Sequence, residues 1–384
     1  MTLRLLTAGE SHGPELVLIV EGVPAGLDVD EDEIDRQLDR RRAGHGRGAR
    51  STKIEHDHAE IVSGVAGART TGSPVAIRIV NRDFANQPPD PVPLTTPRPG
   101  HADLAGAIKH GHADFRLVRE RASARETAAR VAAGALVRPL LREFGVSLGC
   151  FVTRIGDVTV ELDLGSATAQ RLAKLAEAAE PDPVRCPDPA ISELMVAAID
   201  RAQEDRQTLG GSFVAFALGA PAGLGSYTHW DLRLDGRLAQ AICSIPAIKG
   251  VEIGPAFQLA ALPGSQAQDP IVGSGDHLTR QSNFAGGLEG GMSNGEPIVL
   301  RAAMKPLSST RAPVGSVDLR TGTAADPAYV RSDICAVPAA AVVGEAMLGW
   351  VLAQALVERF GGDRLDAALA AARQVDSQPI PDRS

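Results

Sequence analysis

Residues 121–127 read Arg121-Ala-Ser-Ala-Arg-Glu-Thr127 and lead into an alanine-rich run that ends at Gly145. Ser123 and Glu126 have the spacing of a capping box, in which the serine accepts a hydrogen bond from a first-turn N–H and the glutamate reaches back. A helix is therefore expected to start here. Its small side chains allow other elements to approach on several sides, as they do around buried helices. The pattern predicts a central helix.

The start of this predicted helix is rich in positive charge. A helix N-terminus presents free N–H groups and about half a positive charge. Arg121, Arg125 and Arg130 crowd the same end. Together these features favour a site for an anion, and the alternative is an ordinary capped helix with solvated arginines.

Composition narrows the class of protein. The chain has 384 residues, 44% hydrophobic and 22% charged, which is enough to bury a large core. The net charge of −8 and an aromatic content of 3% argue against general nucleic-acid binding. The four cysteines lack any Cys-x-x-Cys spacing, so neither a metal site nor a disulfide framework is expected.

No signal peptide is visible, and no apolar run approaches the ~18 residues of a membrane span. We expect a cytoplasmic protein.

The second half of the sequence repeats the first. The segment from Gly22 to Leu27 returns as Gly219 to Leu224, 197 positions later. A spaced set returns 223 positions later, pairing Gly64, Gly67, Gly72, Pro74 and Arg78 with Gly287, Gly290, Gly295, Pro297 and Arg301. The expected strands are 16–20, 61–65 and 75–80, and the expected helices are 30–42, 123–143, 167–179, 191–204, 234–243 and 338–360. We predict one domain with pseudo-twofold-related units at 1–145 and 205–361, and an insertion at 146–204.

Two histidines are candidates for chemistry. The segment from Gly9 to Gly13 contains Ser11 and His12, but its flanks do not form the strand-turn-helix elbow of a serine hydrolase. His12 is better interpreted as an acid beside a hydroxyl donor, able to serve a leaving group. His101, between Gly100 and Asp103, is the second candidate. A lone histidine is more often a structural hydrogen-bonding residue, and this alternative stays open for both.

Three further stretches carry charge. Residues 40–50 form a glycine-rich basic loop. Three interpretations are open: a solvated surface, a nucleic-acid arm or a binding site for a compact phosphate. The glycines between the arginines favour the phosphate site. Residues 305–310 offer a lysine and hydroxyls suited to a phosphate or a flavin. Residues 331–333 hold either a structural Arg–Asp pair or site residues. Neither an ATP-binding P-loop nor a Rossmann glycine motif is present.

Five of these stretches together resemble the chorismate synthase family, in the family's order and along nearly the whole chain. The stretches are Gly9 to Gly13, Arg98 to Asp103, Ser123 to Thr127, Lys249 to Gly254 and Arg331 to Asp333. The resemblance implies an α+β protein with a β-α-β sandwich around central helices, assembled as a homotetramer. It also implies conversion of 5-enolpyruvylshikimate 3-phosphate to chorismate and phosphate, a 1,4-anti elimination that uses reduced FMN in the shikimate pathway.

The resemblance also assigns residues. His12 protonates the departing phosphate, His101 steadies the protonation of the reduced flavin, and Asp333 assists proton removal through flavin N5, with Ser11 and Ser123 beside them. The implied cofactor contacts are Arg121, Ala122, Ser123, Pro246, Ala247, Gly290, Lys305, Pro306, Leu307, Ser308, Ser309 and Arg331. The implied substrate contacts are Ser11, His12, Arg41, Arg47, Arg125 and Arg331, and Arg41 and Arg47 also match positions described as NADPH-binding. Pro246 and Leu307 depart from the family's usual residues, and each departure bears on one flavin hydrogen bond.

Two other function classes remain open at this point. A flavin-dependent oxidoreductase acting on a phosphorylated small molecule would transfer a hydride to its substrate. A nucleic-acid binder would depend on the basic loop alone. The sequence does not say whether the protein reduces its own flavin with NADPH or depends on a separate flavin reductase.

Overall fold

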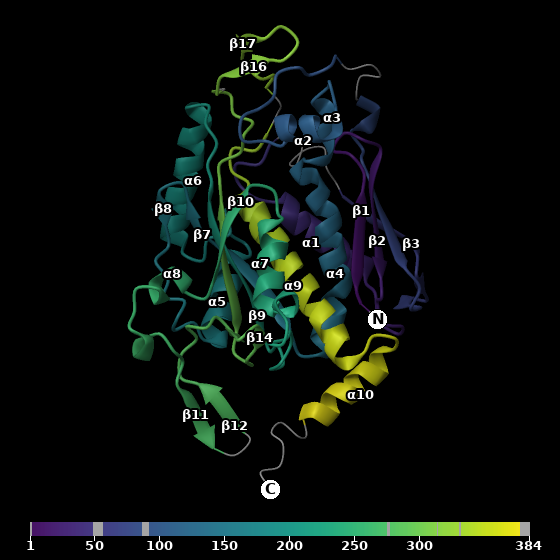
Figure 1. The fold of residues 1–384 in the computed structure, drawn as a ribbon, viewed down its shortest axis with the longest axis vertical. Coiled ribbons are helices and arrows are strands. Elements are labelled where there is room, and N and C mark those ends of the chain that lie inside the picture. Colours follow the sequence, from purple (N-terminus) through teal and green to yellow (C-terminus); the bar gives the residue numbers. More distant parts are fainter. Residues whose placement is uncertain are drawn as a thin grey trace.

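The computed structural model describes residues 2–48, 57–86, 92–274, 277–312, 314–329 and 332–376. The predicted fold class is confirmed, since the chain combines antiparallel sheets with a central group of helices. In Figure 1 one sheet lies on each side of these helices. The smaller elements are α2 (Asp103–His110), α3 (Arg116–Arg121), α8 (Ala256–Leu259), α10 (Leu365–Asp376) and the short pairs β4 (Val65–Ala66) with β5 (Arg69–Thr70), β11 (Ile271–Ser274) with β12 (His277–Arg280), β13 (Leu288–Glu289) with β14 (Met292–Ser293), and β16 (Ser316–Asp318) with β17 (Thr323–Ala325).

The first sheet has four strands in the order β1 (Arg4–Ala8), β2 (Glu15–Glu21), β6 (Val75–Val80) and β3 (Ala59–Ser63), all antiparallel. The strands predicted at 16–20, 61–65 and 75–80 are therefore present. In β2 the side chains of Leu16, Leu18 and Val20 are buried and their neighbours are more exposed. This alternation places one face of the sheet against the helices and leaves the other outside.

The second sheet has the order β10 (Ile248–Ile253), β15 (Ile298–Met304), β9 (Gly211–Leu218), β7 (Ser147–Ile155) and β8 (Val158–Thr159). Strand β7 falls within residues 146–204, which the sequence analysis assigned to an insertion. It is a nine-residue inner strand paired with β9, which the sequence analysis did not predict. Its near-continuous apolar run reflects burial on both faces, because α5 (Ala169–Ala179) and α6 (Pro189–Glu204) pack on the side away from the central helices.

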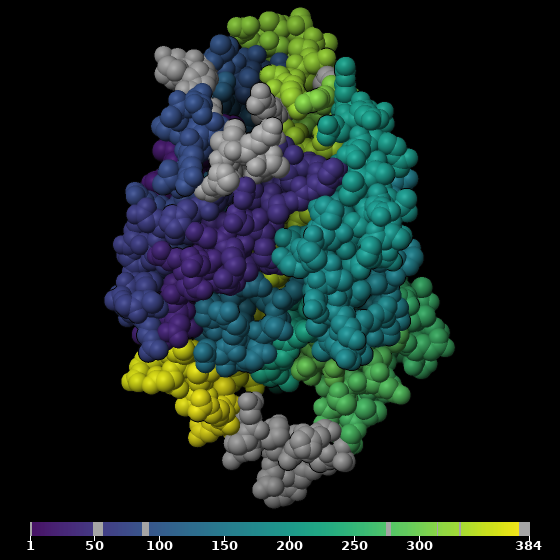
Figure 2. Space-filling model, turned by 180° about the vertical axis from the view of Figure 1, so that it is seen from behind, coloured from purple at the N-terminus to yellow at the C-terminus, as the bar shows by residue number. Residues whose placement is uncertain are grey.

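Four helices fill the centre: α1 (Glu31–Arg42), α4 (Thr127–Glu143), α7 (Leu234–Cys243) and α9 (Val337–Phe360). Helix α4 packs on α9 and on α1, and α9 packs on β9 and β7 of the second sheet. Seen from behind, α1 (purple) crosses the molecule between the first sheet and the teal segment that holds α5 and α6 (Figure 2). The predicted central helix is thus confirmed, with a second one beside it.

The start of α4 differs in part from the predicted capping box. The Ser123 hydroxyl accepts from the N–H of Arg125 at 3.3 Å and caps a short 3₁₀ turn, Ala124–Glu126, which precedes α4. The carboxylate of Glu126 does not reach back. It pairs with Arg130 one turn later, at 2.9 Å, because an ion pair at this spacing competes for the same oxygens.

Helix α9 corrects a second expectation. It has 24 residues and is long and apolar enough to cross a membrane, although the sequence analysis found no apolar run of that length. Alanine and glycine make up much of the run, so it lacks the dense large apolar side chains of an obvious span. Most of the helix is buried inside the fold, as in the core helix of a soluble protein.

Helices α4 and α9 cross at very short range. A Cβ added at Gly134 would lie 2.7 Å from the Ala346 Cβ and 2.9 Å from the Ala346 backbone oxygen. At the ends of the two helices, the rings of Phe144 and Phe360 stack with centroids 5.5 Å apart. The absence of a side chain at Gly134 therefore sets the distance between the two central helices.

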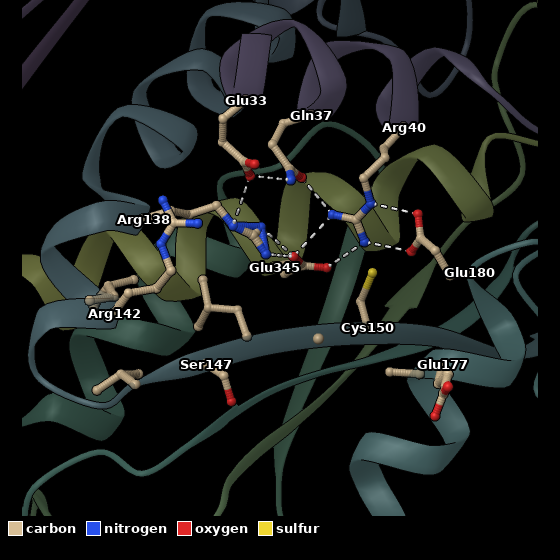
Figure 3. A pocket seen from close by; sticks show the side chains of 15 residues that line it. Glu33, Gln37, Arg40, Arg138, Arg142, Ser147, Cys150, Glu177, Glu180 and Glu345 are labelled. Atoms are coloured by element: carbon tan, nitrogen blue, oxygen red, sulfur yellow. Dashed lines mark hydrogen bonds and ion pairs between the residues drawn. The ribbon is translucent and has the colours of Figure 1, made fainter. Parts of the chain in front are cut away.

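A buried carboxylate joins three of the central helices. Glu345 of α9 is 1% exposed and accepts hydrogen bonds from Arg40 of α1 at 3.0 Å and from Arg138 of α4 at 2.8 Å. Burial acts to raise the pKa of Glu345, but the charges of Arg138 and Arg40 outweigh it and lower the pKa to about 2. Figure 3 shows the two guanidinium groups approaching Glu345 from opposite sides, with Arg40 also bound to Glu180 of α5.

This cluster lines a cavity of about 400 Å³ between α1, α4, α5, α9 and β7. The Cys150 side chain lies against Glu345, and burial raises the pKa of that thiol. None of the site residues predicted from the sequence lines this cavity. Arg40, Arg138, Glu180 and Glu345 pair with one another across the cavity, so we interpret these ion pairs as structural links between the helices.

We expect Gly134→Ala to destabilise the protein by about 1–3 kcal/mol, because the new methyl group would meet backbone atoms that cannot move aside. Gly236→Ala in α7 is the matched control, since a Cβ there meets no atom within 4 Å. It should be neutral or stabilise by up to about 1 kcal/mol. Urea unfolding of both variants measures the difference, and equal stability would contradict the close-packing argument.

Glu345→Gln should change the acid dependence of stability. The native pKa of Glu345 lies below the ordinary value of 4.5, so its stabilisation is complete above pH 4.5 and is lost as the pH falls toward 2. The difference in unfolding free energy between wild type and variant should narrow by about 2 kcal/mol between pH 7 and pH 3. Glu358 lies on the same helix as Glu345 and pairs with Arg237 of α7. The variant Glu358→Gln should change the acid dependence of stability little. If the unfolding free energies of wild type and Glu345→Gln changed in parallel with pH, the lowered pKa of Glu345 would be disproved.

Candidate active site

Most of the site residues predicted from the sequence meet near the start of α4, close to α2 and α3 (Figure 1). They come from the turn between β1 and β2, the loop after α1, the segments flanking α2 and α3, and the loops after β15 and before α9. Residues far apart in the sequence are thus brought to one region.

The turn from Gly9 to Gly13 carries Ser11 and His12. Gly9 has a φ of +106°, and a Cβ there would lie 2.4 Å from the Glu15 carbonyl oxygen, so this position requires glycine. The Ser123 hydroxyl donates to the Ser11 hydroxyl at 3.1 Å. The structure therefore brings Ser11, the adjacent His12 and Ser123 into one group.

Glu120 of α3 holds His12. Its Oε2 accepts from the His12 backbone N–H at 2.6 Å, and its Oε1 lies 2.8 Å from the ring Nδ1. The Glu120 backbone oxygen also accepts from the N–H of Ser11 at 3.0 Å. The sequence analysis did not identify Glu120, because nothing in the local sequence near 120 indicates contact with residues 11 and 12.

Arg125 and Arg41 lie buried at the start of α4. Arg125 forms a two-pronged ion pair with Asp57 at 2.5 and 2.7 Å. Arg41 donates to the Thr127 hydroxyl at 2.9 Å and to the Ala124 carbonyl at 3.1 Å. Burial acts to raise the pKa of Asp57, but hydrogen bonding and charge from Arg125 and the charge of Arg41 keep it below its usual value. Two guanidinium groups thus share the carboxylate of Asp57.

The other two arginines expected at this helix start point elsewhere. Arg121 donates to the Thr7 carbonyl and hydroxyl and to the Gly9 carbonyl, and so supports the turn that carries His12. Arg130 pairs with Glu126 and donates to the Ser244 hydroxyl at 2.7 Å. The prediction of a cationic helix start is therefore supported for Arg125, with Arg41 in place of Arg121 and Arg130.

The loop after α1 is not a solvated charge run at the two positions of interest. The side chains of Arg41 and Arg47 are each 5% exposed. Arg47 pairs with Asp333, and the Gly48 N–H donates to the other oxygen of Asp333 at 2.6 Å. The predicted catalytic residue Asp333 is thus held beside the basic loop. Arg331 lies outside the described residues.

His101 belongs to a second charged group. Its Nδ1 lies 2.6 Å from Asp103, and Arg98 donates to the same carboxylate at 2.9 Å and to the Ser309 hydroxyl at 2.7 Å. Asp103 is fully buried, which acts to raise its pKa, but hydrogen bonds from His101 and Arg98 hold the pKa well below its usual range. A carboxylate therefore faces Nδ1 of each candidate histidine.

The loop after β15 adjoins this group. The Lys305 N–H donates to the Ala247 carbonyl at 2.9 Å, and its ammonium donates to the Ser308 hydroxyl at 3.1 Å. Ser308 in turn donates to the Gly100 carbonyl at 2.8 Å. Burial and the nearby Lys249 charge lower the pKa of Lys305. Leu307 departs from the family's usual residue. Its backbone carbonyl accepts a hydrogen bond from the Thr208 hydroxyl at 2.8 Å, and this bond holds the residue in place.

One predicted cofactor contact lies apart. Gly290 is exposed in the turn between β13 and β14, before β15, whereas Lys305 follows the far end of β15. Seven strand residues span about 20 Å. Within one copy of the chain, Gly290 is therefore not brought together with residues 305–309, although Pro246 and Ala247 lie beside them.

Helix α3 lies between the two histidine groups. Glu120 binds His12, and the preceding residue, Arg119, approaches Asp103 to 3.9 Å. Arg119 is buried, and its Nε and Nη2 have no hydrogen-bond partner in the described part of the chain. Burial and the charge of Arg98 lower the pKa of Arg119 to about 10. Sequence reasoning missed Asp57, Arg119 and Glu120, because each acts on residues distant in the chain.

Comparison with known proteins agrees with the resemblance stated above. A family model described as Chorismate synthase matches residues 3–357. A curated relative of that name from Desulforudis audaxviator is 54% identical over 378 residues, which cover 96% of this chain and 95% of the relative. Another from Rubrobacter xylanophilus is 54% identical over 375 residues, covering 95% and 94%. A solved structure described as "Crystal Structure of Chorismate Synthase" matches with a TM-score of 0.81 and 42% identity over 98% of both chains. On this evidence the chain belongs to the chorismate synthase family.

Proposed function

We propose that the site described above carries out the family's reaction, with the two histidines in separate roles. As a chorismate synthase, the chain is a carbon–oxygen lyase that converts 5-enolpyruvylshikimate 3-phosphate to chorismate and phosphate in aromatic amino acid biosynthesis. The observation that carries the assignment of roles is the meeting of His12, His101 and Asp333 with buried arginines in one region.

Phosphate departure needs charge neutralisation and a proton. Arg41 and Arg125 are held at the turn capped by Ser123, whose hydroxyl binds Ser11, and Arg47 is held beside Asp333. Such fixed cations stabilise charge that develops on a leaving oxygen. Because Glu120 binds Nδ1 of His12, Nε2 is the ring nitrogen left to donate. We assign His12 as the acid to the leaving phosphate.

The residues near His101 fit reduced FMN. Lys305, the neighbouring Lys249 and the hydroxyl of Ser308 offer charge and hydrogen bonds, and Gly100 allows close approach, since a Cβ there would lie 3.3 Å from the Ser308 hydroxyl. Reduced FMN, when bound, supplies electrons that return to it in a reaction without net redox change. We assign His101, which is fixed by Asp103, to steady the protonation of the reduced flavin. Asp333, fixed by Arg47 and Gly48, is the candidate to accept a proton.

The source of the reduced flavin is best assigned to a separate reductant. Arg41 and Arg47, the positions that match NADPH contacts, are buried and bonded within the chain. They are therefore more suited to a compact substrate than to a second nucleotide. A separate flavin reductase would meet this need in the cytoplasm.

Several copies of the chain are expected to assemble, in line with the homotetramer implied by the resemblance. The outer face of the first sheet exposes apolar side chains, among them Leu6, Ile19, Val62 and Val80. Exposed apolar patches commonly mark protein interfaces. An assembly would also allow Gly290 to approach the site of a neighbouring copy.

We further infer that the domain consists of two similar units. The Thr70 hydroxyl donates to the Pro24 carbonyl at 2.5 Å and accepts from the Leu27 N–H at 2.9 Å. The Ser293 hydroxyl makes the equivalent bonds to Pro221 and Leu224 at 2.6 and 2.8 Å, at the offsets found in the sequence. Both sheets also run in the same order, β1-β2-β6-β3 and β7-β9-β15-β10. This order favours a second unit that begins at β7, with the insertion confined to the segment between β7 and β9.

Anaerobic turnover tests the function directly. With 5-enolpyruvylshikimate 3-phosphate and FMN, dithionite should support release of one phosphate per chorismate, and NADPH alone should not. The amount of reduced flavin should be the same before and after turnover. Loss of reduced flavin in proportion to product would instead favour the alternative, a flavin-dependent oxidoreductase acting on a phosphorylated small molecule. Turnover with NADPH alone would overturn the assignment to a separate reductant.

His12→Ala and His101→Ala should have different effects. His12→Ala should slow phosphate release by about 10²–10⁴-fold, with FMN affinity unchanged, because the acid is lost while the arginines still neutralise charge. His101→Ala should alter the absorbance of bound reduced flavin. Single-turnover kinetics with pre-reduced FMN from pH 6 to 9 measure both, and His229→Ala, at an exposed surface pair, is the control. Wild-type phosphate release in His12→Ala across that range would remove the assignment.

A further inference from the structure

Glu120 uses one carboxylate to bind two parts of the same residue. One oxygen accepts from the His12 backbone N–H at 2.6 Å, and both oxygens lie within 3.0 Å of the ring Nδ1. The Glu120 side chain is 13% exposed, whereas the His12 side chain is 33% exposed. The carboxylate is thus largely sheltered from solvent, and the histidine retains an accessible side for a ligand.

This contact fixes the chemistry of the ring. A carboxylate at Nδ1 favours the tautomer with the proton on Nδ1 and leaves Nε2 as the nitrogen that exchanges a proton with a ligand. A negative charge beside the ring also stabilises the protonated imidazolium over the neutral form. In hydrolases with a Ser-His-Asp triad, a buried aspartate acts on its histidine in the same manner.

The charged groups of the described residues near this pair come from three places. Helix α3 contributes Arg119 and Arg121 on either side of Glu120, and Arg121 is engaged with the backbone of Thr7 and Gly9. The turn itself contributes Glu10, which is exposed. The start of α4, where Ser123 binds Ser11, contributes Arg125, paired with Asp57, and receives Arg41 at the Ala124 carbonyl. Among these groups, Glu120 is the carboxylate for which the structure gives a direct contact with the His12 ring.

We propose that Glu120 is a positioning residue that acts through His12, holding its ring with Nε2 toward the leaving phosphate and favouring positive charge on the ring. This inference rests on the proposed function, in which His12 is the acid. A structural alternative exists, because Glu120 and Arg121 both support the turn from Gly9 to Gly13. The two roles differ in their dependence on pH.

Glu120→Gln separates them, since glutamine keeps the size of the side chain and loses its charge. An acid must be protonated, so the rate of phosphate release falls as the pH rises. Loss of the carboxylate should move this fall about one pH unit lower and reduce the rate about tenfold at higher pH. At low pH the rate should approach that of wild type. A role confined to supporting the turn would reduce the rate by a similar factor at every pH.

A second measurement does not depend on turnover. Diethyl pyrocarbonate reacts with neutral imidazole, so the pH dependence of labelling at His12, followed by peptide mass spectrometry on the full chain, reports its protonation. Labelling of His12 should shift to lower pH in Glu120→Gln and shift less in Glu120→Asp, which retains the charge. Glu10→Gln, which removes a nearby carboxylate of the same turn, is the matched control and should leave the profile in place. Thermal unfolding of each variant confirms that it is folded.

The outcomes separate the two proposals. A shift in both the labelling profile and the pH–rate profile supports the inference. An unshifted labelling profile in folded Glu120→Gln overturns it, whatever the rate. A shifted labelling profile with an unshifted pH–rate profile shows that His12 is not the acid, which overturns the proposed function of His12 and with it the role of Glu120.

Discussion

The arrangement of the central helices depends on one buried carboxylate. Glu345 of α9 is bound by Arg40 of α1 and Arg138 of α4, and these charges keep it ionised inside the core. The site lies at the ends of the same helices, since Arg41 and Arg47 follow Arg40 and the turn capped by Ser123 begins α4. Removing one partner of a buried ion pair is costly, because the remaining charge is stranded. The ion pairs that hold the core helices together and the position of the site are therefore linked through α1 and α4.

Charge pairing is the common feature of the site. Arg125 has Asp57, Arg47 has Asp333, Arg98 has Asp103 and His12 has Glu120. Each cation is held in one orientation before any ligand arrives, which lowers the reorganisation needed on binding. The carboxylates at the two histidines differ from the rest, because they set which ring nitrogen faces outward. This arrangement gives similar residues different tasks within one region.

The site draws on segments from both halves of the chain. The segments up to the start of α4 supply the turn with Ser11 and His12 and the basic loop, and the segments after β15 supply Lys305, Ser308 and Asp333. Contacts such as the pairing of Arg47 with Asp333 and of Ser308 with the Gly100 carbonyl join the two sets. The site therefore forms only when the two halves of the chain are packed together.

The sequence by itself determined the family, the α+β class, the central helix and most of the residues that meet at the site. These follow from short motifs and from helical or alternating periodicity, which are local properties of the chain. It did not predict the strand β7, gave Glu126 the wrong partner and did not identify the apolar length of α9. Only the tertiary structure revealed Asp57, Arg119 and Glu120, and only it showed that Gly290 lies apart from Lys305 within one copy. The physical reason is that an ion pair between residues 12 and 120 depends on how α3 packs against a turn more than 100 residues away, and no periodicity in the sequence encodes that distance.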